Sequence, residues 1–239
     1  MRIRTNREDI EIHPKAIIRL MDLSAKHLGS IVIKGRRYQP TREAWIASVF
    51  LFALEKLHNQ TWFLRVNPKE NAIEDIFASA YIEIPGLPGA SDRKTSKLQV
   101  FEYTKHNKNT LIEAVQDKLR SDLTNCILIC YIKTDYKIVW PSLRAELYSK
   151  SPKVREIWIL GDTGKRKMVI GQVFSQPSAI FLDLDEAHRD KEERTFISPF
   201  PVSKRVAKSK RSPIQPTGKT ILLKPEMLLD EEDGREDAI

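Results

Sequence analysis

The sequence contains little cysteine. Only Cys126 and Cys130 occur among its 239 residues, both in the run CILIC. On a strand these two side chains share one face about 13 Å apart, which is too far for a disulfide. Buried free thiols favour a reducing compartment, and the polar beginning MRIRTNREDI lacks the apolar stretch of a secretory signal. We therefore expect an intracellular protein, cytoplasmic or, in a eukaryote, nuclear.

Long apolar runs and closely spaced histidines are also missing. The longest apolar run, AWIASVFLFAL at residues 44–54, is shorter than a membrane span. The five histidines, at positions 13, 27, 58, 106 and 188, do not have the spacing of zinc ligands. We expect neither a membrane-spanning helix nor a histidine-based zinc centre.

Positive charge is in excess over negative charge. The 40 Lys and Arg residues exceed the 32 Asp and Glu residues, which gives a formal net charge of +8. Such an excess favours an anionic partner such as nucleic acid. A basic surface that is merely solvated is the alternative.

The order of predicted elements indicates an α/β domain. The stretch TREAWIASVFLFALEKLHN predicts a buried helix with Thr41 as its N-cap. Strands are predicted in TWFLRVNP, DIFASAYIEIP and KLQVFEYTK, and the last two form an antiparallel hairpin. Thr110 and Glu113 predict a capping box, and NCILICYIK is typical of a strand covered on both faces. We expect a mixed central sheet flanked by helices, an α/β/α sandwich.

Composition divides the chain into three parts. Residues 1–40 predict a helical and irregular lead-in, and residues 41–189 predict the α/β domain. Residues 190–239 predict a largely disordered tail, basic in SKRVAKSKR and acidic in DEEDGREDAI. The basic run could contact a nucleic-acid backbone or an acidic protein, act as a nuclear address, or be a solvated linker. The apolar TILLKPEMLL could dock a protein partner.

One strand carries a carboxylate where a core residue is expected. In KLQVFEYTK, period-two alternation places Leu98, Val100 and Glu102 on one face. A carboxylate that continues an apolar face costs free energy unless a metal ion, a lysine or several hydrogen bonds neutralise it. A solvated carboxylate at the sheet edge is the alternative.

Two residues are expected to lie near Glu102. Asp75 opens the partner strand of the hairpin, so antiparallel pairing should bring it near residues 104–106. Two acids on adjacent strands can hold a hard cation such as Mg²⁺. Lys118 lies at the edge of an apolar helical stripe and should lean toward the sheet, where it could stabilise charge on a phosphorane. The alternatives are a turn residue for Asp75 and a solvated lysine for Lys118.

The order of elements resembles the PD-(D/E)xK nuclease superfamily. The resemblance rests on the acid of IEDIFA, the central acid of QVFEYTK, the helix after them and the apolar strand CILICYI. The resemblance to this restriction-endonuclease-like fold covers roughly residues 41–135. It implies metal-dependent phosphodiester hydrolysis, with Asp75 and Glu102 binding Mg²⁺ or Mn²⁺. The lysine that the family carries two residues after the second acid is Thr104 here. Lys118 is therefore the better candidate and Lys105, one position late, the weaker one.

These observations favour a Mg²⁺-dependent endonuclease acting on DNA, which is favoured over RNA, in restriction, repair, transposition or defence. Glu43 or Glu55 could supply a third acid. The alternatives are a catalytically inactive subunit of the same fold that binds nucleic acid or a protein partner, and a structural interaction protein with exposed acids. A homodimer is left open.

Overall fold

The computed structural model describes residues 11–29, 35, 38–66, 76–83, 91–104, 110–133, 138–150 and 152–189. The chain divides into one unit of residues 1–202 and a second of residues 203–239, and every described residue belongs to the first. The tail predicted for residues 190–239 lies outside the described residues, as do Asp75 and Lys105.

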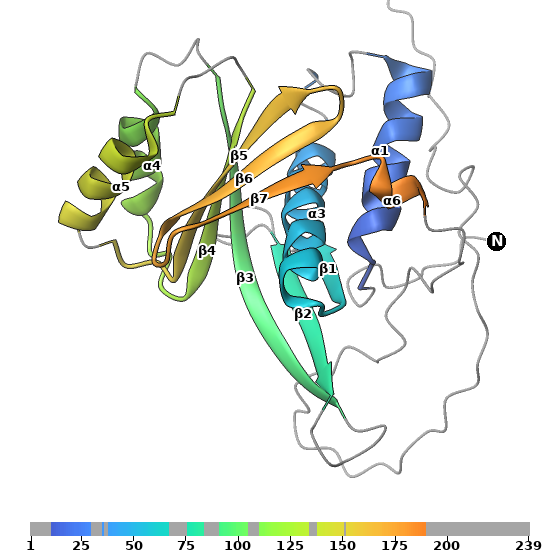
Figure 1. Ribbon diagram of the computed structural model, residues 1–239, viewed down its shortest axis with the longest axis horizontal. Coiled ribbons are helices and arrows are strands. Elements are labelled where there is room, and N and C mark those ends of the chain that lie inside the picture. Colours follow the sequence, from blue (N-terminus) through green and yellow to red (C-terminus); the bar gives the residue numbers. More distant parts are fainter. Residues whose placement is uncertain are drawn as a thin grey trace, which may run out of the picture. The chain divides into compact units, whose positions relative to one another are not determined.

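The described part of the chain forms one mixed sheet with the strand order β1-β2-β3-β4-β5-β6-β7 (Figure 1). Strands β3, β4 and β5 run parallel, and the remaining neighbours pair antiparallel. The mixed α/β architecture expected from the sequence is therefore confirmed. The strands are β1 (Trp62–Val66), β2 (Ile76–Glu83), β3 (Ser91–Tyr103), β4 (Cys126–Ile132), β5 (Glu156–Gly164), β6 (Lys167–Phe174) and β7 (Ser178–Asp183).

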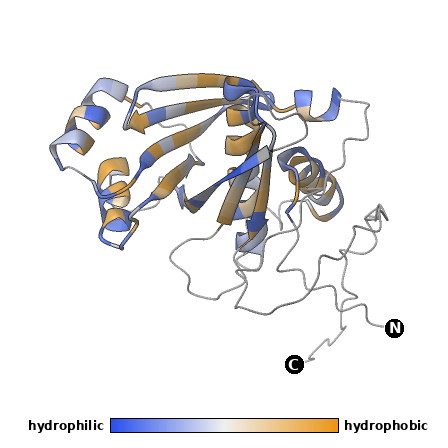
Figure 2. Cartoon of the chain, turned by 90° about the horizontal axis from the view of Figure 1, so that it is seen from below, coloured by the Kyte–Doolittle hydropathy of each residue, from blue (hydrophilic) through white to orange (hydrophobic). Residues whose placement is uncertain are grey.

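Helices pack on both faces of this sheet. Buried residues of α1 and α3 form one apolar core with strands β1 to β7, and buried residues of α4 and α5 form a second core on the other face. Apolar residues are concentrated in the strands and in α3 (Figure 2). No described helix is long and apolar enough to cross a membrane. The helices are α1 (Pro14–Leu28), α3 (Gln39–His58), α4 (Leu111–Leu119), α5 (Trp140–Ser149) and α6 (Glu186–Arg189).

Helix α3 is buried on most sides, as its sequence predicts. The predicted start of the helix is wrong, because α3 begins at Gln39 and Tyr38 occupies the N-cap position without a side-chain hydrogen bond. Pro40 lies in the first turn, where its fixed φ and missing N–H are tolerated. Thr41 is therefore inside the helix.

The local signals around β4 are confirmed. Thr110 and Glu113 form the capping box of α4, with the Thr110 N–H donating to Glu113 at 2.7 Å. On β4, Ile127 packs in the core on the α3 face and Leu128 in the core on the α4 face. Cys126 and Cys130 are buried free thiols.

The register of the β2–β3 hairpin differs from expectation. The first residue of β2, Ile76, pairs with Leu98, whereas the expected register brings the start of this strand to residues 104–106. Ile76 and Leu98 are buried in the same core beneath α3, and this packing fixes which residues pair. The first part of β3 pairs with β2, and its last part, from Lys97 to Tyr103, pairs with β4.

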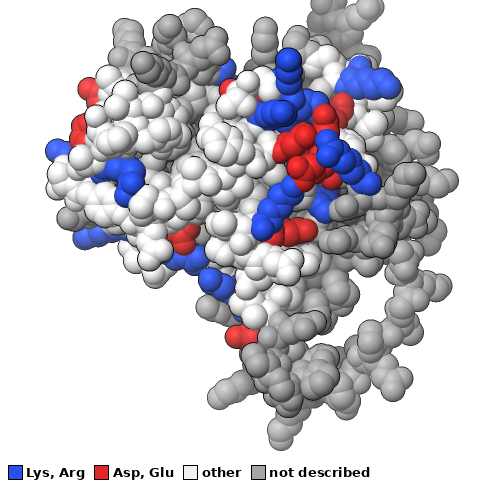
Figure 3. Space-filling model, viewed as in Figure 1, with Lys and Arg blue, Asp and Glu red and all other residues white. Residues whose placement is uncertain are grey.

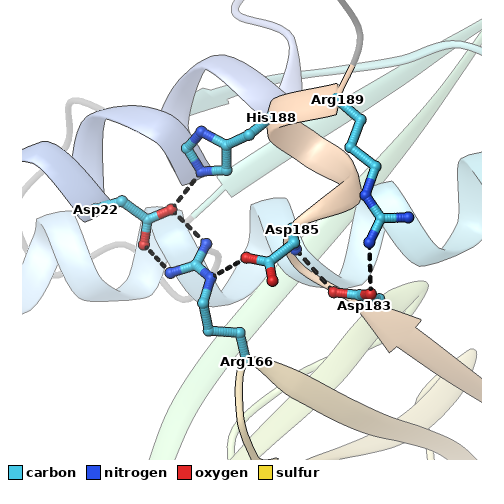
Figure 4. Close-up of polar contacts among 6 residues, drawn as sticks. All are labelled: Asp22, Arg166, Asp183, Asp185, His188 and Arg189. Carbon is cyan, nitrogen blue, oxygen red and sulfur yellow. Dashed lines mark hydrogen bonds and ion pairs between the residues drawn. The ribbon is translucent and has the colours of Figure 1, made fainter.

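An ion-pair network joins α1, the β5–β6 turn and α6 (Figure 4). Arg166 donates to both carboxylate oxygens of Asp22, at 2.9 and 2.7 Å, and to Asp185 at 2.6 Å. His188 lies 2.7 Å from Asp22. The face in Figure 3 carries a compact group of mixed charges beside a wide area without Lys, Arg, Asp or Glu. The network stabilises the attachment of α1 and α6 to the turn.

Asp22→Asn should lower the free energy of unfolding by about 1 kcal/mol at neutral pH. Burial alone would raise the pKa of Asp22, but hydrogen bonds from Arg166 and His188 outweigh it and lower the pKa below 3.8. A lowered pKa in the folded state contributes stability above the unfolded-state pKa, and this stability is lost as the pH falls through the folded-state pKa. Urea unfolding at pH 7 and pH 2.5 measures it. The difference between the two proteins should be smaller at pH 2.5 than at pH 7, with exposed Asp117→Asn as the control. An equal difference at both pH values would contradict the prediction.

Candidate functional site

Glu102 lies near the carboxyl end of β3, on the face of the sheet that α3 covers. Leu98 and Val100, four and two residues before it, are buried in the core on that face. The Glu102 side chain is 16% exposed, so most of the carboxylate is removed from bulk water. Such a carboxylate requires compensating partners.

Arg42 supplies the first partner. It lies in the first turns of α3, is 8% exposed, and its Nε donates to Glu102 Oε1 at 2.8 Å. Its Nη1 donates to the carbonyl oxygen of Gly35 at 2.5 Å. Helix α3 therefore positions a guanidinium group against the carboxyl end of β3.

Lys133 supplies the second partner. Its Nζ forms an ion pair with Glu102 Oε2. Lys133 follows the last residue of β4, and its backbone N–H donates to the Tyr103 carbonyl oxygen at 3.0 Å. Parallel strands bring their carboxyl ends to the same edge of a sheet, and this pairing places the lysine beside Glu102.

An aromatic pair lies next to this group. Tyr131 pairs with Glu102 across β3 and β4, and its ring meets Trp45 of α3 edge-to-face, with 5.5 Å between centroids. Burial, with smaller contributions from the carboxylates of Asp162 and Glu102, raises the pKa of Tyr131 to about 12. The phenol is therefore neutral at physiological pH and can donate a hydrogen bond. We call Arg42, Glu102, Lys133 and Tyr131 the Glu102 site.

The structure does not bring Lys118 to this site. Lys118 is exposed on α4, and its Nζ lies 5.9 Å from the centroid of the Phe101 ring. Phe101 packs in the core on the α4 face, whereas Glu102, the next residue along β3, lies on the α3 face. Helix α4 does place Lys118 near the sheet, but on the face opposite the one that carries Glu102.

The two candidate third acids have other partners. Glu43 is half-buried and accepts a hydrogen bond from Gln39 at 2.8 Å. Glu55 forms ion pairs with His13 at 3.1 Å and Lys15 at 3.9 Å. The other two sequence candidates, Asp75 and Lys105, lie outside the described residues.

Sequence reasoning missed both cationic partners of Glu102. Lys133 follows an apolar strand directly, and it would have been found if parallel pairing of that strand with β3 had been predicted. Arg42 carries a weaker signal, because a basic residue in a first helical turn is unfavourable to the helix dipole and indicates a partner outside the helix.

Glu102 is the one carboxylate of the Glu102 site. Both oxygens of Glu102 face cationic side chains. The described residues include no group of three His, Cys, Asp or Glu side chains that could hold a metal ion. A divalent cation bound at Glu102 would need a further carboxylate, for which the sequence offers Asp75, and it would replace Lys133 or Arg42 as a direct partner of Glu102.

The fold and the Glu102 site define an α/β protein whose sheet carries a cation-flanked carboxylate at the carboxyl ends of its parallel strands. No family model, no curated protein and no solved structure matches the chain.

Proposed function

We propose that this protein is a Mg²⁺-dependent nuclease of the PD-(D/E)xK type, with the restriction-endonuclease-like fold, that acts on DNA. The observation that carries the proposal is the largely buried Glu102, held between Arg42 and Lys133 at the carboxyl end of β3. The antiparallel β1, β2 and β3, followed by α4 and a parallel β4, agree with the order of elements on which the resemblance rests.

In this proposal Glu102 and Asp75 hold the cation, and Lys133 takes the role that the family gives to its lysine. When bound, the cation would activate water and neutralise charge on the phosphate. Arg42 and Lys133 each carry a positive charge and Glu102 carries a negative charge, so the group has a net charge of +1. This excess favours binding of a phosphate and stabilises the additional charge of the transition state.

The proposed compartment is reducing, which means the cytoplasm or, in a eukaryote, the nucleus. The two buried free cysteines support this placement, because disulfides are rare there.

Nicking of supercoiled plasmid and cleavage of a labelled single strand, each with Mg²⁺, Mn²⁺ or EDTA, test the proposal. Glu102→Gln should reduce metal-dependent cleavage by about 100-fold or more, because the substitution removes the charge of a proposed cation ligand and keeps its shape. The control is Glu113→Gln, since this exposed residue of α4 has a capping role that glutamine also performs. Full activity of the Glu102→Gln protein would contradict the proposal.

A second function is favoured by the same contacts. Both oxygens of Glu102 already have cationic partners, so Arg42, Glu102 and Lys133 would also stabilise the packing of α3 on β3 and β4. The protein would then be a catalytically inactive nuclease-fold subunit that binds nucleic acid or a protein partner. Wild-type protein that shifts DNA on a gel but does not cleave it with either metal would favour this function.

A further inference from the structure

The β2–β3 hairpin extends beyond the strands on either side of it. Strand β1 pairs with β2 only as far as Ala80, and β4 pairs with β3 only from Lys97 onward. The outer hairpin, residues 81–83 of β2 and 91–96 of β3, is thus two-stranded within the described part of the chain. Figure 1 shows it projecting away from β4 to β7.

The base of the outer hairpin is held by a buried polar cluster. Glu11, which is 2% exposed, accepts hydrogen bonds from Ser79 Oγ at 2.7 Å and Tyr81 Oη at 2.8 Å, and it pairs with Arg93. Arg93 Nη2 also donates to Ser79 at 3.0 Å. Arg93 and Tyr81 both bind Glu11 through these contacts, which fix the direction in which the hairpin projects.

Two exposed lysines lie on opposite faces of this hairpin. Lys94 pairs with Ala80, whose side chain is in the core on the α3 face, so Lys94 belongs to that face. Lys97, at the root of the outer hairpin, precedes Leu98 of the same core and therefore lies on the other face. Both lysines are exposed. The segment SDRKTSK, residues 91–97, contains three basic residues and one acidic residue.

We propose that the outer hairpin and its root at Lys97 form a docking surface for double-stranded DNA, with Lys94 and Lys97 contacting phosphates. This inference rests on the proposed function and deepens it by naming a duplex as the substrate. The major groove of B-DNA admits a two-stranded β-ribbon and has a phosphate backbone on each side. Lysines on opposite faces of a ribbon are placed to reach both backbones.

Other nucleic acids fit the outer hairpin less well. The major groove of an RNA duplex is too deep and narrow for side chains to read. Single strands are usually bound by stacking of bases on exposed aromatic rings, whereas Tyr81 is engaged with Glu11. Charge on both faces without a stacking ring favours duplex DNA.

The docking surface is remote from the Glu102 site. Lys94 and Glu102 are eight residues apart on β3, which corresponds to about 27 Å along the strand. At about 3.4 Å per base pair, Lys94 would contact phosphates about eight base pairs from the scissile bond, and Lys97, five residues from Glu102, would contact phosphates about five base pairs from it. Their contribution should therefore be to affinity and orientation.

The test measures binding of the full-length Lys94→Gln, Lys97→Gln double variant to a labelled 30-base-pair duplex in EDTA, over a series of salt concentrations. The slope of log K against log salt concentration is negative, and each lost phosphate contact reduces its magnitude by about 0.9. The slope of the double variant should therefore be smaller in magnitude than that of the wild type by about 1.8. The control is Lys165→Gln, Lys167→Gln, which removes the same charge from exposed positions in the β5–β6 turn and should keep the wild-type slope.

Three results would overturn the inference: a wild-type slope in the double variant, an equal loss in the control, or an equal loss of affinity for a single strand of the same length. Because binding is read in EDTA, the result does not depend on cleavage. A wild-type protein that never cleaves DNA but shows the expected slopes would contradict the nuclease proposal and leave the docking surface intact.

Discussion

Lys133→Ala should reduce metal-dependent DNA cleavage by about 100-fold or more, whereas Lys118→Ala should have little effect. The expectation follows from the faces of the sheet. Lys133 forms an ion pair with Glu102 on the α3 face, and Lys118 lies over Phe101 on the α4 face. A charge on the far side of a close-packed sheet cannot contact a phosphate at Glu102.

Single-turnover cleavage at saturating DNA measures this prediction, because it reads chemistry apart from binding. Lys133→Arg tests whether charge alone is sufficient, and it should recover only part of the rate because a planar guanidinium replaces a compact ammonium group. A large loss in Lys118→Ala with normal rates in Lys133→Ala would reverse the assignment and return the catalytic lysine to α4.

Glu11→Ala should lower the free energy of unfolding by about 3 to 5 kcal/mol. Glu11 is buried and accepts from Ser79 and Tyr81 while it pairs with Arg93. Its removal takes from the guanidinium group its counter-charge and from two hydroxyl groups an acceptor, and each loss is costly because these groups are largely removed from water.

Urea denaturation at neutral pH measures the loss, which should shift the midpoint and leave the slope nearly unchanged. Glu11→Gln should cost less, because an amide oxygen still accepts from the hydroxyl groups. The control is Asp92→Ala, since this exposed residue of the same hairpin accepts a hydrogen bond from the backbone N–H of Arg93 and no other within the described part of the chain. A loss below 1 kcal/mol for Glu11→Ala would show that the cluster contributes little to stability.

The sequence was sufficient for features that depend on neighbours along the chain. The capping box at Thr110 and the burial of β4 on both faces follow from residues a few positions apart. The face of Glu102 also followed from strict alternation along β3. The prediction that Thr41 is the N-cap of α3 was wrong, because Pro40 favours a first helical turn that begins earlier.

The candidate site was predicted only in part, because its partners come from distant segments. Alternation along β3 places Glu102 on the α3 face, but it does not say that Arg42, sixty residues earlier, lies beside it. The lysine was sought in the next residues and the next helix, and the structure instead brings Lys133 from the following strand.

The sequence by itself therefore determined the mixed α/β class, the capping box of α4, and the position of an acid on an apolar face. Only the tertiary structure decided the register of β2 on β3, the pairing of Glu102 with Arg42 and Lys133, and the separation of Lys118 from Glu102 by the thickness of the sheet. Local patterns fix which face a side chain occupies, whereas long-range packing fixes which residues meet there.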